Sequence, residues 1–157
     1  MKRILVPINS SAESLEAAKE AIRQAGRSAC VQVHLLHVQD RMLPEETLVV
    51  SPLETMDRHY FKRSRSALAP AEKLLRDAGV AFVSHSMIGR VAEAILEKQC
   101  ELECDSIVMS AKRGRGARAS SWSSTCAKVQ KQSPVPVDLI KITAAPDITD
   151  EPISAKI

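Results

Sequence analysis

Aromatic residues are scarce in this chain. Its 157 residues include one Trp, one Tyr and two Phe. Proteins that bind single-stranded nucleic acid stack its bases on several aromatic side chains. The net charge of +3 is also mild for a nucleic-acid partner. We therefore do not expect nucleic-acid binding, and we expect a core built from Val, Ile, Leu and Ala.

Long hydrophobic runs are also missing. No apolar stretch approaches the roughly 20 residues that a helix needs to cross a bilayer. The apolar part of the N-terminal MKRILVPINSS is too short for a signal peptide. The four cysteines, at positions 30, 100, 104 and 126, follow no metal-binding spacing. These absences predict a cytoplasmic protein with free thiols, no membrane partner and no metal site.

A recognisable catalytic set is missing too. His34 and His37 fall on opposite faces of a predicted strand, and His59 and His85 are isolated in the sequence. No Ser/His/Asp or Cys/His combination can be assigned to one site from these positions. We expect no catalytic residue, and a binding protein is favoured over an enzyme.

Apolar segments with two different periodicities are present and alternate along the chain. Strands are predicted at residues 4–8, 31–38, 80–87, 105–109 and 135–142, and helices at residues 10–26, 56–78, 91–102 and 121–132. This alternation predicts one α/β domain, with a doubly wound, five-stranded parallel sheet and helices on both faces. The domain would span residues 1–142, followed by a loosely ordered tail over residues 143–157.

Two details of the helices follow from single residues. Ser10 and Glu13 have the spacing of a capping box and predict where the first helix begins. Pro70 lies inside the second helical pattern and predicts a kink or a break there.

The stretch from Asp105 to Thr125 combines the parts of a phosphate site. An apolar strand leads into a basic loop with two glycines, and hydroxyl residues follow at the expected start of a helix. Main-chain N–H groups, cations and hydroxyls in this order favour an anion. A solvated basic loop followed by helix-capping hydroxyls is an equally good interpretation.

Parallel sheets bind ligands beyond the carboxyl ends of their strands, where the strand order reverses. If the first and fourth strands are central, residues 7–10 and residues 110–118 face each other there. The sequence therefore places a candidate site between these two loops.

Five segments together resemble the universal stress protein family: KRILVPINSSAES, VHLLHV, GRVAEAIL, CDSIVMSAKRGRG and SPVPVDLIKI. The resemblance extends from Lys2 to about Ile142. It implies a flavodoxin-like or HUP-type fold with strand order 3-2-1-4-5. It also implies a homodimer formed through the last strand, with candidate interface residues Val135, Val137, Leu139 and Ile140.

Many members of that family bind ATP through Gly-x-x-Gly, a nine-residue gap, and Gly-Ser/Thr after the fourth strand. In this chain the three glycine positions hold Ser110, Arg113 and Ser123, and the hydroxyl position holds Ser124. Asn9 stands where the family has an aspartate. The resemblance implies these candidate nucleotide-binding residues: Pro7, Asn9, Ser10, Val38, Met109, Ser110, Arg113, Gly114, Arg115, Gly116, Ser123, Ser124 and Thr125.

The favoured hypothesis is a cytoplasmic stress-response protein that acts by dimerisation and by binding a regulatory protein partner. ATP or another adenine nucleotide would be its cofactor and regulator. One alternative is a slow ATPase or nucleotide-processing enzyme on the same fold, for which Asp40 is the acid near a strand end. The other is a scaffold without nucleotide, in which Arg113 or Trp122 fills the nucleotide volume.

Overall fold

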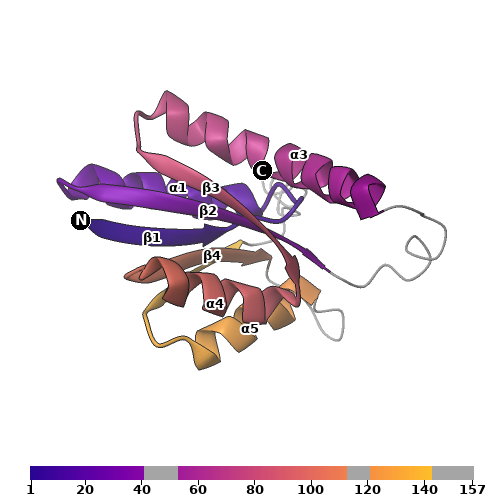
Figure 1. The fold of residues 1–157 in the computed structure, drawn as a ribbon. Helices are drawn as coiled ribbons and strands as arrows, with labels where there is room; N and C mark the ends of the chain where they lie inside the picture. Colours follow the sequence, from indigo (N-terminus) through magenta and orange to yellow (C-terminus); the bar gives the residue numbers. More distant parts are fainter. Residues whose placement is uncertain (41–52, 113–120, 143–157) are drawn as a thin grey trace, which may run out of the picture.

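A five-stranded parallel sheet lies between two pairs of helices in the computed structural model, which describes residues 1–40, 53–112 and 121–142 (Figure 1). The strands are β1 Lys2–Pro7, β2 Val31–Asp40, β3 Phe82–Gly89, β4 Ser106–Lys112 and β5 Val137–Ile142. The helices are α1 Ser14–Arg27, α3 Leu53–Asp77, α4 Val91–Leu102 and α5 Ser121–Gln132. The strand order β3-β2-β1-β4-β5 confirms the predicted fold.

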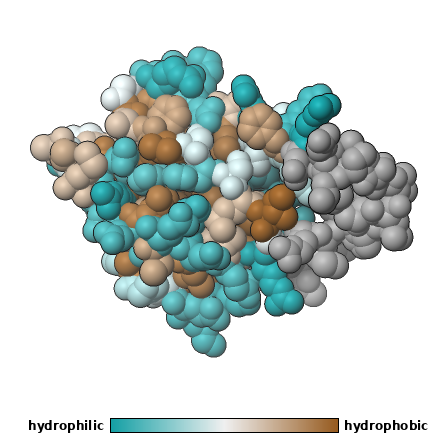
Figure 2. Space-filling model, viewed as in Figure 1, coloured by the Kyte–Doolittle hydropathy of each residue, from teal (hydrophilic) through white to brown (hydrophobic). Residues whose placement is uncertain are grey.

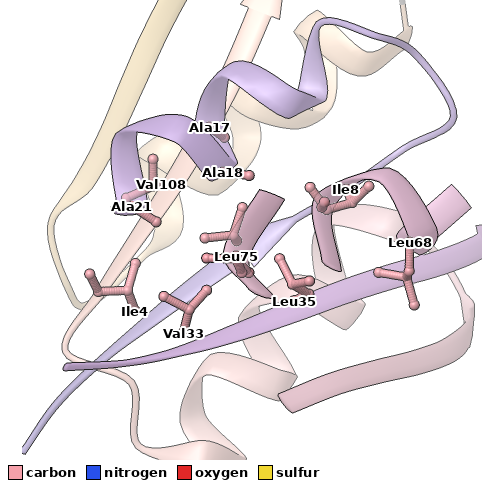
Figure 3. Packing of buried hydrophobic residues seen from close by; sticks show 12 residues of the cluster. Ile4, Ile8, Ala17, Ala18, Ala21, Val33, Leu35, Leu68, Leu75 and Val108 are labelled. Atoms are coloured by element: carbon pink, nitrogen blue, oxygen red, sulfur yellow. The ribbon is translucent and has the colours of Figure 1, made fainter. Parts of the chain in front are cut away.

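Each face of the sheet has its own hydrophobic core. Helices α1 and α3 cover one face, where they enclose Ile4, Val6 and Ile8 of the β1 segment (Figures 1 and 3). Helices α4 and α5 cover the other face, where Leu5 of β1 is buried in the second core. Because successive side chains of a strand point to opposite faces, burial on both sides requires a continuous apolar run. This requirement explains the uninterrupted run of apolar residues in β1.

Helix α1 begins at Ser14, four residues after the predicted start. Residue Glu13 precedes it without a side-chain capping bond, so the predicted capping box is wrong. The Asn9 side chain organises this turn instead, because its Oδ1 accepts hydrogen bonds from the Ser11 N–H (2.9 Å) and the Ser11 hydroxyl (2.6 Å). An Asx turn therefore takes the place of a helix cap.

Helix α3 continues through Pro70, so the alternative that the proline breaks it is wrong. Pro70 lies on the exposed side, while Leu68, Ala71 and Leu75 on the other side are buried in the core. Burial of this face outweighs the one hydrogen bond that proline removes. Strands β3 and β5 each begin two residues after their predicted starts.

Hydrophobic and hydrophilic side chains are interspersed on the face of the molecule seen in Figure 2. In the part of the chain that the structure describes, no helix is long and apolar enough to span a membrane.

Candidate functional site

The carboxyl ends of β1 and β4 are linked by Ser110, which is 1% exposed. Its hydroxyl donates a hydrogen bond of 2.6 Å to the main-chain carbonyl of Glu13, and its own carbonyl accepts one of 2.7 Å from the Trp122 indole N–H. Ser110 thus joins the segment after β1 and the first turn of α5 to the end of β4. A glycine at this position would lack the first of these two bonds.

The other candidate residues on the central strands lie around this link. Pro7 is buried at the end of β1, and Met109 is fully buried in the core under α4 and α5. Val38, near the end of β2, is half-buried against that same core. At this edge of the sheet, Asn9 and Ser10 extend beyond β1 into solvent-accessible positions.

The candidate residues after β4 divide into two groups. Arg113, Gly114, Arg115 and Gly116 lie outside the residues that the structure describes, so their roles remain predictions. Ser123, Ser124 and Thr125 lie near the start of α5, where Ser124 is exposed and the other two are half-buried. The hydroxyl that matches the family motif is therefore accessible at a helix N-terminus.

A groove of about 670 Å³ opens between the segment after β1 and helix α3. Its volume falls in the range of small-molecule sites. Candidate residues Asn9 and Ser10 line one wall, and Lys62 and Arg63 of α3 line the other. The complete lining is Asn9, Ser10, Ser11, Ala12, Ser14, Leu15, His59, Lys62, Arg63, Ser66, Ala67 and Pro70.

The sequence analysis missed the α3 wall of this groove. Its lining residues recur at intervals of three and four, which is the spacing of one helix face. The basic run RHYFKRSR at residues 58–65 was a visible signal for it. Only the packing of α3 beside α1 shows which of these cations lie next to Ser10.

His37 lies below this wall at the carboxyl end of β2. Its Nδ1 lies 2.7 Å from the hydroxyl of Ser64 on α3. Burial lowers the pKa of His37, and the positive charge of Arg63 lowers this pKa further. His37 is therefore neutral at pH 7. Its hydrogen bond with Ser64 connects β2 to α3 and has a structural role.

His34 and His85 form a pair on the opposite face of the sheet, so the expectation that His85 is isolated is wrong. His34 Nδ1 lies 2.9 Å from His85 Nε2, and the two rings stack. Burial lowers the pKa of both histidines. Residues 34 and 85 are diagonal neighbours on adjacent strands, a relation that depends on the β2–β3 register. Within the described ranges, no three His, Cys, Asp or Glu side chains are grouped to hold a metal.

Two features of the site bear on the alternative hypotheses. Glu13 is a second acid at the carboxyl edge besides Asp40, because its main chain contacts Ser110. Trp122 packs against the core on the α4–α5 side, and it is not among the residues that line the groove on the α1–α3 side.

Comparisons with known proteins agree with this architecture. A universal stress protein from Burkholderia pseudomallei is 20% identical, with a TM-score of 0.67, over 88% of this chain and 95% of its own. An Arabidopsis thaliana member of the family, solved with AMP bound, is 20% identical, with a TM-score of 0.65, over 92% and 94% of the two chains. A universal stress protein in complex with cAMP is 17% identical, with a TM-score of 0.63, over 89% and 96%.

A search of curated proteins finds no match to this chain. The profile of the universal stress protein family matches residues 1–141, which is nearly all of the chain outside the C-terminal tail. The chain therefore belongs to the universal stress protein family.

Proposed function

We propose that this protein binds an adenine nucleotide at the carboxyl edge of its sheet and acts as a nucleotide-regulated stress-response protein. The observation that supports this proposal best is the groove beside Asn9 and Ser10, next to the point where the strand order reverses between β1 and β4. Parallel α/β sheets bind ligands at this point. Two relatives with the same fold have AMP or cAMP bound.

In this proposal the nucleotide lies between the ends of the central strands. The backbone of Val38 contacts adenine beside Pro7, and Asn9 approaches the sugar. The hydroxyl of Ser124, exposed at the start of α5, donates to the phosphate nearest the ribose, as helix N-termini commonly do. Ser110 keeps the two loops at a fixed separation through its bond to Glu13.

The protein regulates a protein partner as a homodimer. Strand β5 lies at the edge of the sheet, and such edges are normally covered or paired. Val137 and Leu139 pack against one core and Ile140 against the other, yet all three remain half-exposed, as does Val135 before the strand. Pairing of β5 with a second copy covers this edge and the apolar residues along it.

Binding without turnover fits the chemistry of Asn9. Its Oδ1 already accepts two hydrogen bonds from Ser11, and a neutral amide is a weaker Mg²⁺ ligand than a carboxylate. The ATPase alternative needs an acid near the phosphates, and Glu13 is the candidate that the structure adds. An assay of phosphate release from ATP, on the wild type and on Glu13→Gln, distinguishes the two functions.

Calorimetric titration with ATP, ADP and AMP, each with and without Mg²⁺, tests nucleotide binding directly. We expect saturable heat with at least one nucleotide, and about tenfold weaker binding for Ser124→Ala, the cost of one charge-assisted hydrogen bond. Ser133→Ala is the control, because Ser133 makes its bonds with Val135 after α5. Absence of heat at millimolar nucleotide contradicts the proposal.

A further inference from the structure

Helix α3 presents a row of basic side chains to the groove. His59, Lys62 and Arg63 line it at helical spacing, followed by Ser66 one turn later. Lys62 and Arg63 are both exposed. Neither forms an ion pair with an acid of the described ranges. An anion that lies between these two cations and the opposite wall is attracted by both positive charges.

No acid among the described residues lines the groove, so its charge is positive. The nearest described acid on α3 towards the C-terminus is Glu72, which accepts a hydrogen bond of 2.5 Å from the Ser84 hydroxyl at the sheet. Glu72 is therefore already engaged away from Lys62 and Arg63. The electrostatics of the groove favour a negatively charged ligand.

The opposite wall supplies the hydroxyl of Ser10, while the Ser11 hydroxyl already donates to the Asn9 side chain. Ser10 and Ser11 are exposed there, and small side chains such as Ala12 leave room for a ligand. The first amides of α1 are already used, because the N–H groups of Ser14 and Leu15 donate to the carbonyls of Ser11 and Ala12. The α1 terminus alone therefore does not make this an anion site, and the cations of α3 must provide the main attraction.

We propose that the groove binds the phosphate groups of the ligand, with Lys62 and Arg63 as the cations that hold them and the hydroxyl of Ser10 as a donor. This inference rests on the proposed function for the adenine end of the ligand, since Asn9 and Ser10 belong both to the groove and to the candidate nucleotide site. The two cations replace part of the contact that a glycine-rich turn after β4 would give.

The test compares two single substitutions that remove the same charge from the same helix. Arg63→Gln acts in the groove, whereas Arg65→Gln acts on the outer side of α3, where the Arg65 guanidinium lies 5.7 Å from the centre of the Phe61 ring. The ligands are ATP, adenosine and inorganic tripolyphosphate, measured by calorimetry on the full chain. Thermal melting of each variant shows whether it is folded.

We expect Arg63→Gln to weaken ATP and tripolyphosphate binding about tenfold, the loss of one charge-assisted contact, with adenosine unchanged. Arg65→Gln should bind all three ligands as the wild type does. Lys62→Gln should weaken ATP binding in the same way as Arg63→Gln. Because Lys62 is exposed to solvent, misfolding of this variant would not account for such a loss.

The possible outcomes separate this inference from the proposed function. If ATP binds and the two arginine variants do not differ, the inference is overturned and the proposed function stands. A second outcome is that tripolyphosphate binds with the expected dependence on Arg63, adenosine does not bind, and ATP binds no more tightly than tripolyphosphate. In that case the inference stands and the adenine site is wrong. If no phosphate compound binds at millimolar concentration, both are overturned.

Discussion

At the two ends of the sheet, different groups form the hydrogen bonds between neighbouring segments. At the amino end, main-chain groups join neighbouring segments: the Asp105 N–H donates to the Arg3 carbonyl (2.8 Å), and the Lys2 N–H donates to the Cys30 carbonyl (2.9 Å). The Asp105 carboxylate also accepts a bond of 2.8 Å from the Arg3 N–H. This end is held by the backbone of β1 and its neighbours and by the Asp105 carboxylate.

At the carboxyl end, the segments after β1 and β4 are joined through a side chain, that of Ser110. A groove with two exposed cations opens beside them. The two ends therefore join β1 and β4 differently: main-chain bonds and the Asp105 carboxylate join them at the amino end, and the Ser110 side chain joins them beside the groove at the carboxyl end. Substitutions at the amino end should therefore change stability, and substitutions at the carboxyl end should mainly change binding.

The largest expected effect on stability is at the amino end. Asp105→Ala removes the charge-assisted bond to the Arg3 N–H and should lower the free energy of unfolding by about 1–2 kcal/mol, reduced from the usual range because the residue is exposed. Denaturant titration measures this loss. Asp138→Ala is the control, since the exposed Asp138 bonds only to the side chain of Gln24 among the interactions described, and it should change stability by less than about 0.5 kcal/mol. Equal effects of the two substitutions would contradict the comparison.

Lowering the pH should decrease the free energy of unfolding, because three histidines are buried or half-buried between the two ends of the sheet. Burial lowers the pKa of His34, His37 and His85 from 6.5 in the folded protein. As the pH falls below 6.5, the unfolded chain binds protons that the folded chain does not, so the free energy of unfolding should decrease from pH 7 to pH 5.5 by on the order of 1 kcal/mol.

Denaturant titrations at several pH values measure this decrease. The double variant His34→Gln, His85→Gln should have a flatter profile than the wild type, whatever its absolute stability. A free energy of unfolding that stays constant or rises as the pH is lowered to 5.5 would show that these histidines are not held neutral by the fold.

The smallest expected effect on stability is at the carboxyl end. Ser110→Ala removes one neutral hydrogen bond and should cost about 0.5–1 kcal/mol. The binding free energy of the nucleotide should fall by more than the free energy of unfolding does, because the segment after β1 loses its link to β4. Ser106→Ala is a matched buried control at the other end of β4, where the hydroxyl has no hydrogen-bond partner in the described structure. Nucleotide affinity that responds equally to both substitutions would argue against a binding role for the carboxyl end.

The sequence predicted the fold well because β1 and β2 are buried on both faces and α1 has a clear apolar period. The strand order came from the resemblance, since periodicity does not encode which strands are neighbours. The start of α1 was missed because Asn9 makes an Asx turn that competes with the Ser10 capping box. Local pattern alone does not decide between these two uses of neighbouring polar residues.

The positions of the candidate residues in the fold were predictable in part, for a related reason. Asn9, Ser10, Ser110 and Ser124 lie at the carboxyl edge because strand ends follow from the sheet topology. The α3 wall and the His34–His85 pair depend on contacts between elements distant in sequence, namely α1 with α3 and β2 with β3. Such contacts have no signature in the spacing of residues along the chain.

Chemical-shift mapping of backbone amides during titration with ATP tests the central claim most directly, because it reports both ends of the sheet in one experiment. We predict saturable shifts for residues 9–14 and for Lys62, Arg63 and Ser66, with the amides of Lys2, Arg3 and Asp105 unchanged. Shifts confined to the amino end, or to the outer side of α3 around Arg65 and Ala69, would contradict a ligand site at the carboxyl edge.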